Sequence, residues 1–220
     1  MKIKERGIYL KADEVTAIIG GKKTQLRRVL KTQPVWKESN NLMVSSGWAY
    51  QDPKNKFSLN SYPSEYQDRF ISDLQDQLKS PYGKVGDRLW AREAWSTHAE
   101  FDGIAAKNLT TRSFHYWADG ACKTGKERPS IHMPRWASRL LLEITAIRIE
   151  RLNDISKADA IKQGGPQGHP SIDKVSRGLG YSDWTRSWFA QTWDWVNKIH
   201  TWASNPWVWV IEFSVVQHDQ

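Results

Sequence analysis

A turn near the N-terminus carries glycines, cations and a hydroxyl group that together suit anion binding. The segment 20–28 contains the polar side chains of Lys22, Lys23, Thr24, Arg27 and Arg28. Glycine lets a ligand approach the backbone closely, and Lys and Arg bind phosphate, with Arg able to do so through two parallel hydrogen bonds. The spacing is not that of a P-loop, because Gly-x4-Gly-Lys-Ser/Thr is absent. The turn therefore predicts contacts to phosphate or to a base edge, with a solvated basic turn as the alternative.

A second candidate is the segment 85–95, which alternates like a strand. Leu89, Ala91, Glu93 and Trp95 share one face, and Arg88, Trp90, Arg92 and Ala94 share the other. Glu93 falls on the more apolar face, where an unpaired carboxylate is unfavourable. Two interpretations stay open for Glu93: a buried ion pair with an arginine, or a role in a site.

A third candidate is the loop 128–136. Here His132, Arg135 and Trp136 offer a hydrogen-bonding group, a cation and a ring for stacking. The alternative is a structural loop whose His and Trp fill the interior of the fold.

The composition favours a polyanionic partner. The formal net charge is +8, from 32 Lys and Arg against 24 Asp and Glu. Thirteen tryptophans add indole rings, which stack on bases, although we expect most of them to be core. Simple solubility is the alternative explanation of the charge.

Other classes of protein are disfavoured. Cys122 is the single cysteine, so no internal disulfide can form, and no Cys/His cluster has zinc spacing. No apolar run approaches the roughly 18 residues of a membrane helix, and the N-terminus lacks the pattern of a signal peptide. We therefore expect a cytoplasmic protein with no membrane partner, no metal and no cofactor, in which Cys122 is a free thiol in a loop.

The elements that must position these groups alternate between strands and helices. We expect strands near 8–11, 25–30, 85–95, 114–118, 139–152 and 207–213, and helices near 12–20, 64–78, 156–163 and 183–200. Leu140, Leu142, Ile144 and Ala146 alternate in one apolar phase, whereas Ile147 and Ile149 continue in the other, which predicts a β-bulge or a bend. Both faces of 207–213 are apolar, which predicts a central strand. Residues 164–181 carry glycines and prolines and are interpreted as a loop. The class is α+β with a mixed or antiparallel sheet.

In this order, three of these segments resemble the ASCH domain: Gly21-Lys22-Lys23-Thr24-Gln25-Leu26-Arg27-Arg28, Val85-Gly86-Asp87-Arg88-Leu89-Trp90 and Trp207-Val208-Trp209-Val210-Ile211-Glu212-Phe213. The stretch from Arg128 to Arg139, RPSIHMPRWASR, resembles the phage and prophage branch of that superfamily. The resemblance implies a PUA-like small β-barrel with flanking helices, and binding of RNA or a modified nucleobase. It implies one domain over 1–220, with a polar insertion at about 31–80 and a helical loop insertion at about 164–200.

Small bacterial members of this superfamily are amidohydrolases that act on N4-acylated cytidine. The resemblance matches their catalytic Lys to Lys23, but it places Leu26 at their catalytic Thr and Gln163 at their catalytic Glu. Leu26 cannot attack or relay a proton, and Gln163 cannot act as a general base. Thr24 and Glu93 are the candidate substitutes.

The leading hypothesis is a prophage-encoded protein that binds RNA, single-stranded nucleic acid or a modified nucleoside in one basic cleft. The candidate binding residues are Lys22, Lys23, Arg27, Arg28, Trp90, Arg92, Glu93, His132, Arg135 and Trp136. The second hypothesis is an enzyme, either an amidohydrolase or a nuclease, that uses Lys23, Thr24 and Glu93. The third is a phage assembly or host-takeover factor that binds a phage or host protein through residues 31–80.

Overall fold

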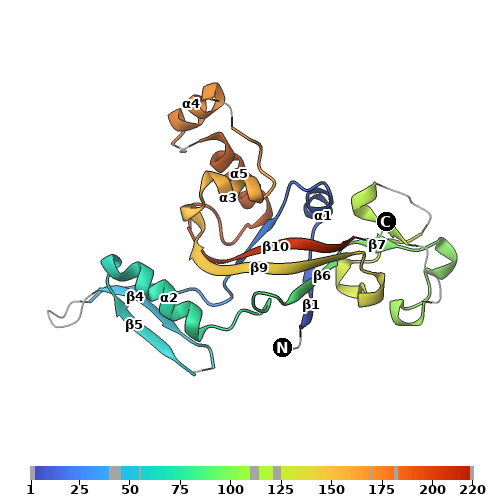
Figure 1. Ribbon diagram of the computed structural model, residues 1–220, viewed down its shortest axis with the longest axis horizontal. Helices are drawn as coiled ribbons and strands as arrows, with labels where there is room; N and C mark the ends of the chain where they lie inside the picture. Colours follow the sequence, from blue (N-terminus) through green and yellow to red (C-terminus); the bar gives the residue numbers. More distant parts are fainter. Residues whose placement is uncertain are drawn as a thin grey trace.

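A five-stranded mixed sheet forms the centre of the protein, with smaller lobes at its two ends (Figure 1). The computed structural model describes residues 3–39, 46–54, 56–109, 114–120, 125–168, 170–180 and 183–218. The strand order is β1 (Glu5–Tyr9), β6 (Arg88–Arg92), β9 (Leu140–Arg151), β10 (Trp207–His218) and β2 (Gln25–Val29). The β1–β6 pair is parallel and the other three pairs are antiparallel. The predicted α+β class with a mixed sheet is confirmed.

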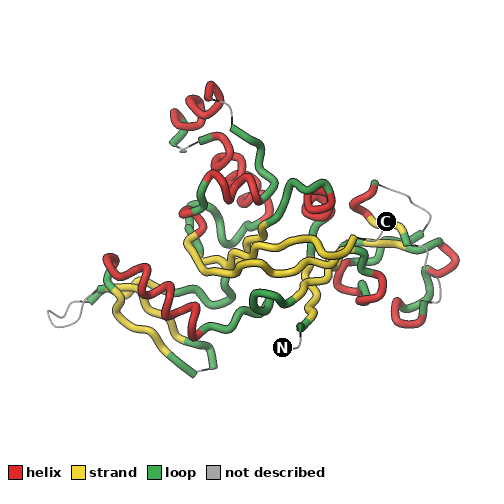
Figure 2. Tube along the Cα trace, viewed as in Figure 1, coloured by secondary structure: helices red, strands yellow, loops and turns green. Residues whose placement is uncertain are grey.

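The two long strands β9 and β10 are paired at the centre of the sheet and are its longest elements (Figure 2). Their register shifts where Ile144 pairs with Phe213 and Ala146 pairs with Glu212, which leaves Thr145 as the extra residue of a β-bulge. The predicted change of apolar phase therefore has its expected cause. The bulge lets β9 direct apolar side chains to different faces before and after this point.

The part of β10 at 207–213 has apolar side chains buried on both faces, as its sequence predicts. Trp207, Trp209, Ile211 and Phe213 belong to the largest apolar cluster, on one face of the sheet. Val208 and Val210 face a second cluster, which contains Phe189 and Trp193. The helix at 12–19 and the segment 31–80 supply side chains to the first cluster, and the helix at 184–196 supplies side chains to the second.

The helices α3 (Lys157–Lys162) and α5 (Trp184–Val196) pack on the face of the sheet that carries Val208 and Val210, with α4 (Pro170–Gly178) farther out (Figure 1). The buried residues of α1 (Ala12–Ile19) belong instead to the apolar cluster of the other face. The helix predicted near 156–163 is confirmed as α3, and Ser156 caps it, because its Oγ accepts a 3.0 Å hydrogen bond from the N–H of Asp159. The prediction of a loop over 164–181 is wrong, because it contains α4. Pro170 is the first residue of α4, a position that proline favours.

The segment 31–80 is more than a polar insertion. It forms a three-stranded sheet of β3 (Val35–Lys37), β4 (Gly47–Gln51) and β5 (Ser58–Tyr62), followed by a 3-10 turn and α2 (Gln67–Gln77). Phe70 and Leu74 of α2 are fully buried, and the Phe70 ring lies 5.6 Å from that of Trp207. The helix predicted near 64–78 is confirmed as α2, and the strands β3, β4 and β5 were not predicted. Through α2 and β4 the segment supplies part of the main core.

The lobe at the other end of the sheet is built from short elements. It contains β7 (Trp95–Ser96), β8 (His115–Tyr116) and the 3-10 helices Ala99–Phe101, Ala106–Asn108, Trp117–Asp119, Ser130–His132 and Arg135–Ala137; a further 3-10 helix, Leu152–Asp154, follows β9. A small cluster of Trp95, Met133 and Ala137 forms the core of this lobe. The predicted strand at 114–118 is thus limited to β8. Cys122 lies outside the described residues.

The described strand pairs do not close the sheet into a barrel, since β1 and β2 are its two edges. The barrel remains a prediction. None of the described helices has the length and the apolar character that crossing a membrane requires. Three tryptophans depart from the predicted core location: Trp195, Trp36 and Trp136 are exposed, Trp195 by 80%.

Candidate functional site

The glycine turn directs Lys23 into the interior of the protein. Just past α1, the N–H groups of Lys22 and Lys23 donate to the carbonyl of Ala17, at 2.8 and 3.0 Å. Gly21 has a φ of 67°, a left-handed conformation that favours glycine. The chain therefore reverses directly into β2 and buries Lys23, whereas Lys22 and Thr24 stay exposed.

A chain of hydrogen bonds fixes Lys23 against the end of α3. Its Nζ donates to the backbone carbonyl and to Oε1 of Gln163, at 3.1 and 3.0 Å. Nε2 of Gln163 donates to Gln25 at 3.0 Å, and Nε2 of Gln25 donates to Asp159 at 2.9 Å. These bonds orient both amides. Gln163, which the resemblance aligns with a catalytic Glu, does lie beside Lys23.

The carboxylate beside Lys23 belongs to Glu14 on α1, at 3.9 Å from Nζ. The two oxygens of Glu14 each accept a 3.2 Å hydrogen bond from Arg28, and one also accepts from the backbone N–H of Lys11 at 3.1 Å. Burial acts to raise the pKa of Glu14, but the charges of Arg28 and Lys23 and these hydrogen bonds outweigh it. The pKa of Glu14 therefore lies below its ordinary value, and the group is ionised at neutral pH.

For Lys23, burial is the dominant effect on the pKa. Removal from water lowers the pKa of Lys23 from 10.5 to about 8, although the charge of Glu14 acts to raise it. Lys23 is still mostly protonated at pH 7. An ammonium group has three donors. Gln163 accepts from two of them, which leaves one for a group that enters from the side of Glu14.

These side chains line a cavity of about 650 Å³ between α1, β2 and α5, called the main cavity below. Lys23, Glu14, Arg28 and Gln163 form a polar wall. Aromatic side chains form much of the remainder: Tyr9, Tyr82, Trp188, Phe189 and Trp193. A volume of about 300–1,000 Å³ with apolar walls and a few convergent polar groups is typical of a small-molecule site.

Arg27 lines the main cavity, but its guanidinium is bound by polar side chains of the protein interior. Its guanidinium donates to Gln25 and to Glu150, lies 3.6 Å from Asp159, and sits 5.7 Å from the centre of the Phe189 ring. The side chain of Arg27 is fully buried. The structure therefore holds Arg27 in an internal ion pair, whereas the side chain of Arg28 is partly exposed. A phosphate contact by either residue remains a prediction.

Glu93 lies in a separate place, in an ion pair with Arg139. Both carboxylate oxygens accept from the guanidinium at 3.1 Å, and both side chains are buried. Asp119 caps the other edge of Arg139 at 2.7 and 2.8 Å, and the Tyr116 ring lies 4.0 Å from the guanidinium carbon. The face predicted for Glu93 is correct, but the ion-pair interpretation applies rather than the site interpretation.

The other predicted aromatic and basic residues lie outside the main cavity. Arg92 sits between the rings of Tyr9 and Trp90, at 5.0 and 5.1 Å. His132 is exposed on the lobe that carries β7, next to Arg92 in a second hollow. Trp136 is exposed on the same lobe.

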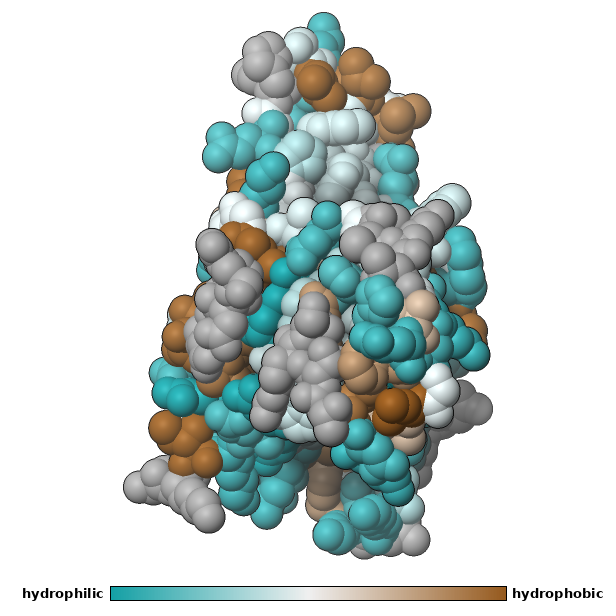
Figure 3. Space-filling view, turned by 90° about the vertical axis from the view of Figure 1, so that its right-hand side faces the viewer, coloured by the Kyte–Doolittle hydropathy of each residue, from teal (hydrophilic) through white to brown (hydrophobic). Residues whose placement is uncertain are grey.

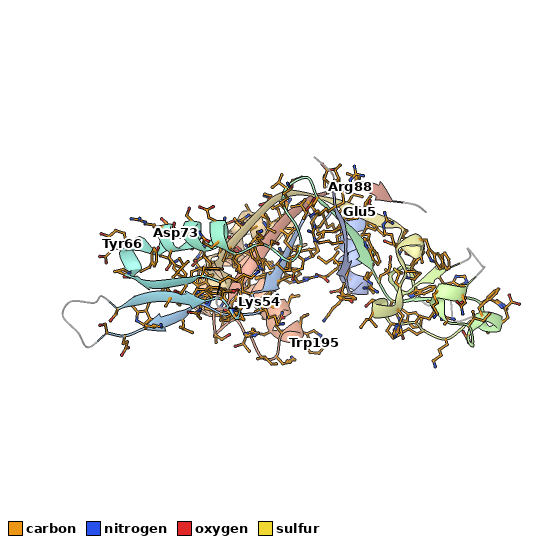
Figure 4. All side chains as sticks on the ribbon, turned by 90° about the horizontal axis from the view of Figure 1, so that it is seen from below. Glu5, Lys54, Tyr66, Asp73, Arg88 and Trp195 are labelled. Atoms are coloured by element: carbon orange, nitrogen blue, oxygen red, sulfur yellow. The ribbon has the colours of Figure 1, made fainter. Side chains whose placement is uncertain are left out.

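Arg135 pairs with Glu5 on the edge strand β1, at 2.8 Å. Figure 4 shows Glu5 near Arg88, its partner in the β1–β6 register, and far from Trp195. The single cleft predicted to join all these residues is therefore divided, with Lys23, Arg27 and Arg28 in one hollow and Arg92 and His132 in another.

Glu14 and the tryptophans that line the main cavity were not predicted from the sequence as site residues. Glu14 and Ala17 lie three residues apart on α1 and both line it, so the face of the helix that precedes the glycine turn was the available signal. Trp188 and Trp193 belong to α5, which was predicted as a helix, and the expectation for most tryptophans was the core. Only the packing of α5 beside β2 shows that these two indoles line a cavity.

Within the residues described, no group of three or more His, Cys, Asp or Glu side chains could hold a metal ion.

Comparisons with known proteins found one similar structure. No protein-family model matches the chain, and no curated protein matches it. The chain is similar to the crystal structure of an ASCH domain from Lactobacillus crispatus JV V101, at 13% identity over 98% of this chain and 81% of that chain, with a TM-score of 0.35. A TM-score this low does not establish a shared fold.

Proposed function

We propose that the main cavity binds a nucleobase, as a nucleoside or within RNA, and that the chain is a PUA-like ASCH-domain protein of phage or prophage type. The observation that carries the proposal is the junction of a buried ammonium, an ionised carboxylate and aromatic walls in one cavity of about 650 Å³. The family part rests on the motifs of the glycine turn and of the segment 128–139.

The geometry suits a base edge with a carbonyl at one end and an amino group at the other. The remaining donor of Lys23 would face the carbonyl oxygen, and the carboxylate of Glu14 would accept from the amino N–H. Cytosine presents O2 and its N4 amino group in this way on its Watson–Crick edge. The aromatic side chains that line the cavity would contact the face of the base, as in other single-stranded RNA sites.

Replacement of Trp188 by leucine should weaken cytidine binding about tenfold to a hundredfold. The substitution keeps apolar bulk but removes the ring, and stacking of a base on an aromatic ring contributes about 1–3 kcal/mol. Trp195→Leu is the matched control, because Trp195 is 80% exposed on the same helix and lies outside the lining of the main cavity (Figure 4). Titration calorimetry with cytidine measures both variants; equal affinity for the two would contradict the proposed site.

Binding is favoured over amide hydrolysis by the places of Leu26, at the catalytic Thr position of the resemblance, and of Thr24, its candidate substitute. Leu26 is fully buried in the main core, and Thr24 is exposed, outside the described residues that line the main cavity. Neither of these two positions offers a hydroxyl nucleophile to a base beside Lys23. Glu93, the other candidate substitute, is bound to Arg139.

We therefore expect N4-acetylcytidine to remain intact when it is incubated with the protein. Chromatography of the mixture over time measures any release of cytidine. Release that the protein accelerates, and that Lys23→Met abolishes, would instead assign the cavity to an amidohydrolase that uses Lys23 and Glu14.

The protein-partner hypothesis for residues 31–80 remains a prediction. Because α2 and β4 contribute to the main core, deletion of the segment would disturb folding as well as any partner. Surface substitutions on β3 and β5 are the better test of that hypothesis.

A further inference from the structure

A second hollow of about 770 Å³ lies in the lobe that carries β7. Its lining includes the cations Arg92, Lys107, Lys126 and Arg128, with Asp102 and Glu127 as the acids. Asp102 already accepts a 2.8 Å hydrogen bond from the backbone N–H of Lys126. The lining also includes apolar residues, among them Ala105, Ala106, Met133 and Pro134. Seen from this end of the protein, hydrophilic and hydrophobic side chains both reach the described surface (Figure 3). Because four cations outnumber two acids in the lining, the hollow suits an extended anion.

The second hollow and the main cavity share a wall. Tyr9 lines the main cavity, and its hydroxyl accepts a 3.1 Å hydrogen bond from Arg92, which lines the second hollow. Ser130 lines the main cavity, whereas Pro129 and His132, on either side of it in the chain, line the second hollow. The 3-10 helix Ser130–His132 is thus part of the wall between the two hollows. A ligand that passes over this wall would reach both hollows.

The contrast between the two hollows indicates what such a ligand contains. The main cavity has aromatic walls and a small set of hydrogen-bonding groups, which suit a base. The second hollow has exposed lysines and no comparable set of rings among the described residues that line it. A single strand of RNA has this alternation, because each base is flanked by charged phosphates.

We propose that the second hollow binds the phosphodiester backbone of a single-stranded RNA whose base occupies the main cavity, so that the ligand is an oligonucleotide rather than a free nucleoside. The inference rests on the proposed function, since it requires a base in the main cavity. Lys107 and Lys126 contact phosphate through their exposed ammonium groups. Arg92, which is held by Tyr9 and by the carbonyl of Ile131, provides fixed positive charge at the wall between the two hollows.

The test compares cytidine with a short oligocytidylate on three forms of the full chain. These forms are the wild type, the double variant Lys107→Ala/Lys126→Ala, and the control Lys37→Ala/Lys54→Ala. The control removes the same charge from exposed lysines of the lobe formed by 31–80, at the opposite end of the sheet (Figure 1). Circular dichroism checks that each variant is folded.

We expect the oligomer to bind the wild type at least tenfold more tightly than cytidine does. The double variant Lys107→Ala/Lys126→Ala should lose most of this difference in affinity between oligomer and cytidine, while its affinity for cytidine stays unchanged. Its plot of log affinity against log salt should also become shallower by about 1.4, since each phosphate contact on a single strand contributes about 0.7. The control should behave like the wild type.

Several results would overturn the inference. If cytidine and the oligomer bind equally, or if this double variant matches the control, the second hollow does not hold phosphate, and the proposed function stands. If poly-glutamate competes with the oligomer as well as unlabelled RNA does, the hollow is a general anion surface, and the inference is wrong. If neither cytidine nor the oligomer binds the wild type, the proposed function fails together with this inference.

Discussion

Glu93→Gln is expected to lower the free energy of unfolding by about 3 kcal/mol. The substitution keeps the shape of the side chain but removes the charge that pairs with Arg139, and both partners are buried. Removal of one partner of a buried pair costs about 3–5 kcal/mol, because the other charge stays in a poorly solvated place. We expect the lower end of this range, since Asp119 also pairs with Arg139. Urea unfolding followed by fluorescence measures the change.

Glu143→Gln is the matched control for this prediction. Glu143 pairs with Arg88 at 3.4 Å, but about a third of each side chain is exposed. Exposed pairs contribute about 0–1 kcal/mol, so this variant should unfold almost like the wild type. Equal destabilisation by the two substitutions would mean that burial of the Glu93 pair has no energetic consequence. Cytidine binding by folded Glu93→Gln should equal that of the wild type, because Glu93 lies outside the lining of the main cavity.

Local patterns in the sequence predicted the parts of the fold that depend on neighbouring residues. The alternation along β6 placed Glu93 on the buried face because successive side chains of a strand point to opposite sides. The change of apolar phase along 139–152 predicted a bulge or a bend in this strand, and the helix expected near 156–163 follows its cap Ser156. Each of these features is decided within a few residues, so a single sequence carries enough information.

The assembly of the site depends on packing between distant segments, which no local pattern specifies. Lys23 meets Gln163 across 140 positions in the chain, and it meets Glu14 because α1 folds back on the turn. Nothing in the residues around Lys23 distinguishes Glu14 from Glu93 as the partner carboxylate. The resemblance aligned Gln163 with a catalytic position, and that alignment agrees with the observed contact.

The sheet of β3, β4 and β5 was missed for a related reason. Its strands are short, and β3 is exposed along its whole length. What stabilises the sheet is the contact of a few residues with the main core, such as Trp48 with Trp207 at 5.2 Å between ring centres. Average polarity over the segment 31–80 conceals these contacts, whereas pairs of aromatic residues within it are the better signal.

Lys23→Met is expected to change how stability depends on pH. In the folded protein the pKa of Lys23 is about 8, whereas an ordinary lysine, and therefore the unfolded chain, has 10.5. Between these two values the unfolded chain binds more protons than the folded protein, so stability rises with pH. At about 1.4 kcal/mol per pKa unit, the gain from pH 8 to pH 10.5 is about 3 kcal/mol. Below pH 8 both states are protonated, and the wild type bears the full cost of a buried charge.

The methionine variant lacks this contribution, and comparison with it removes the effect of every other group that titrates in the same range. The wild type should therefore gain about 3 kcal/mol relative to Lys23→Met between pH 7.5 and pH 10.5, as measured by urea unfolding at a series of pH values. A constant difference across the range would show that Lys23 titrates like an exposed lysine. The polar wall of the main cavity would then be open to water, and a base bound there would compete with solvent for Lys23 and Glu14. A rising difference instead means that the cavity keeps its ammonium group in a poorly solvated place, where a hydrogen bond to a base is stronger than it would be in water.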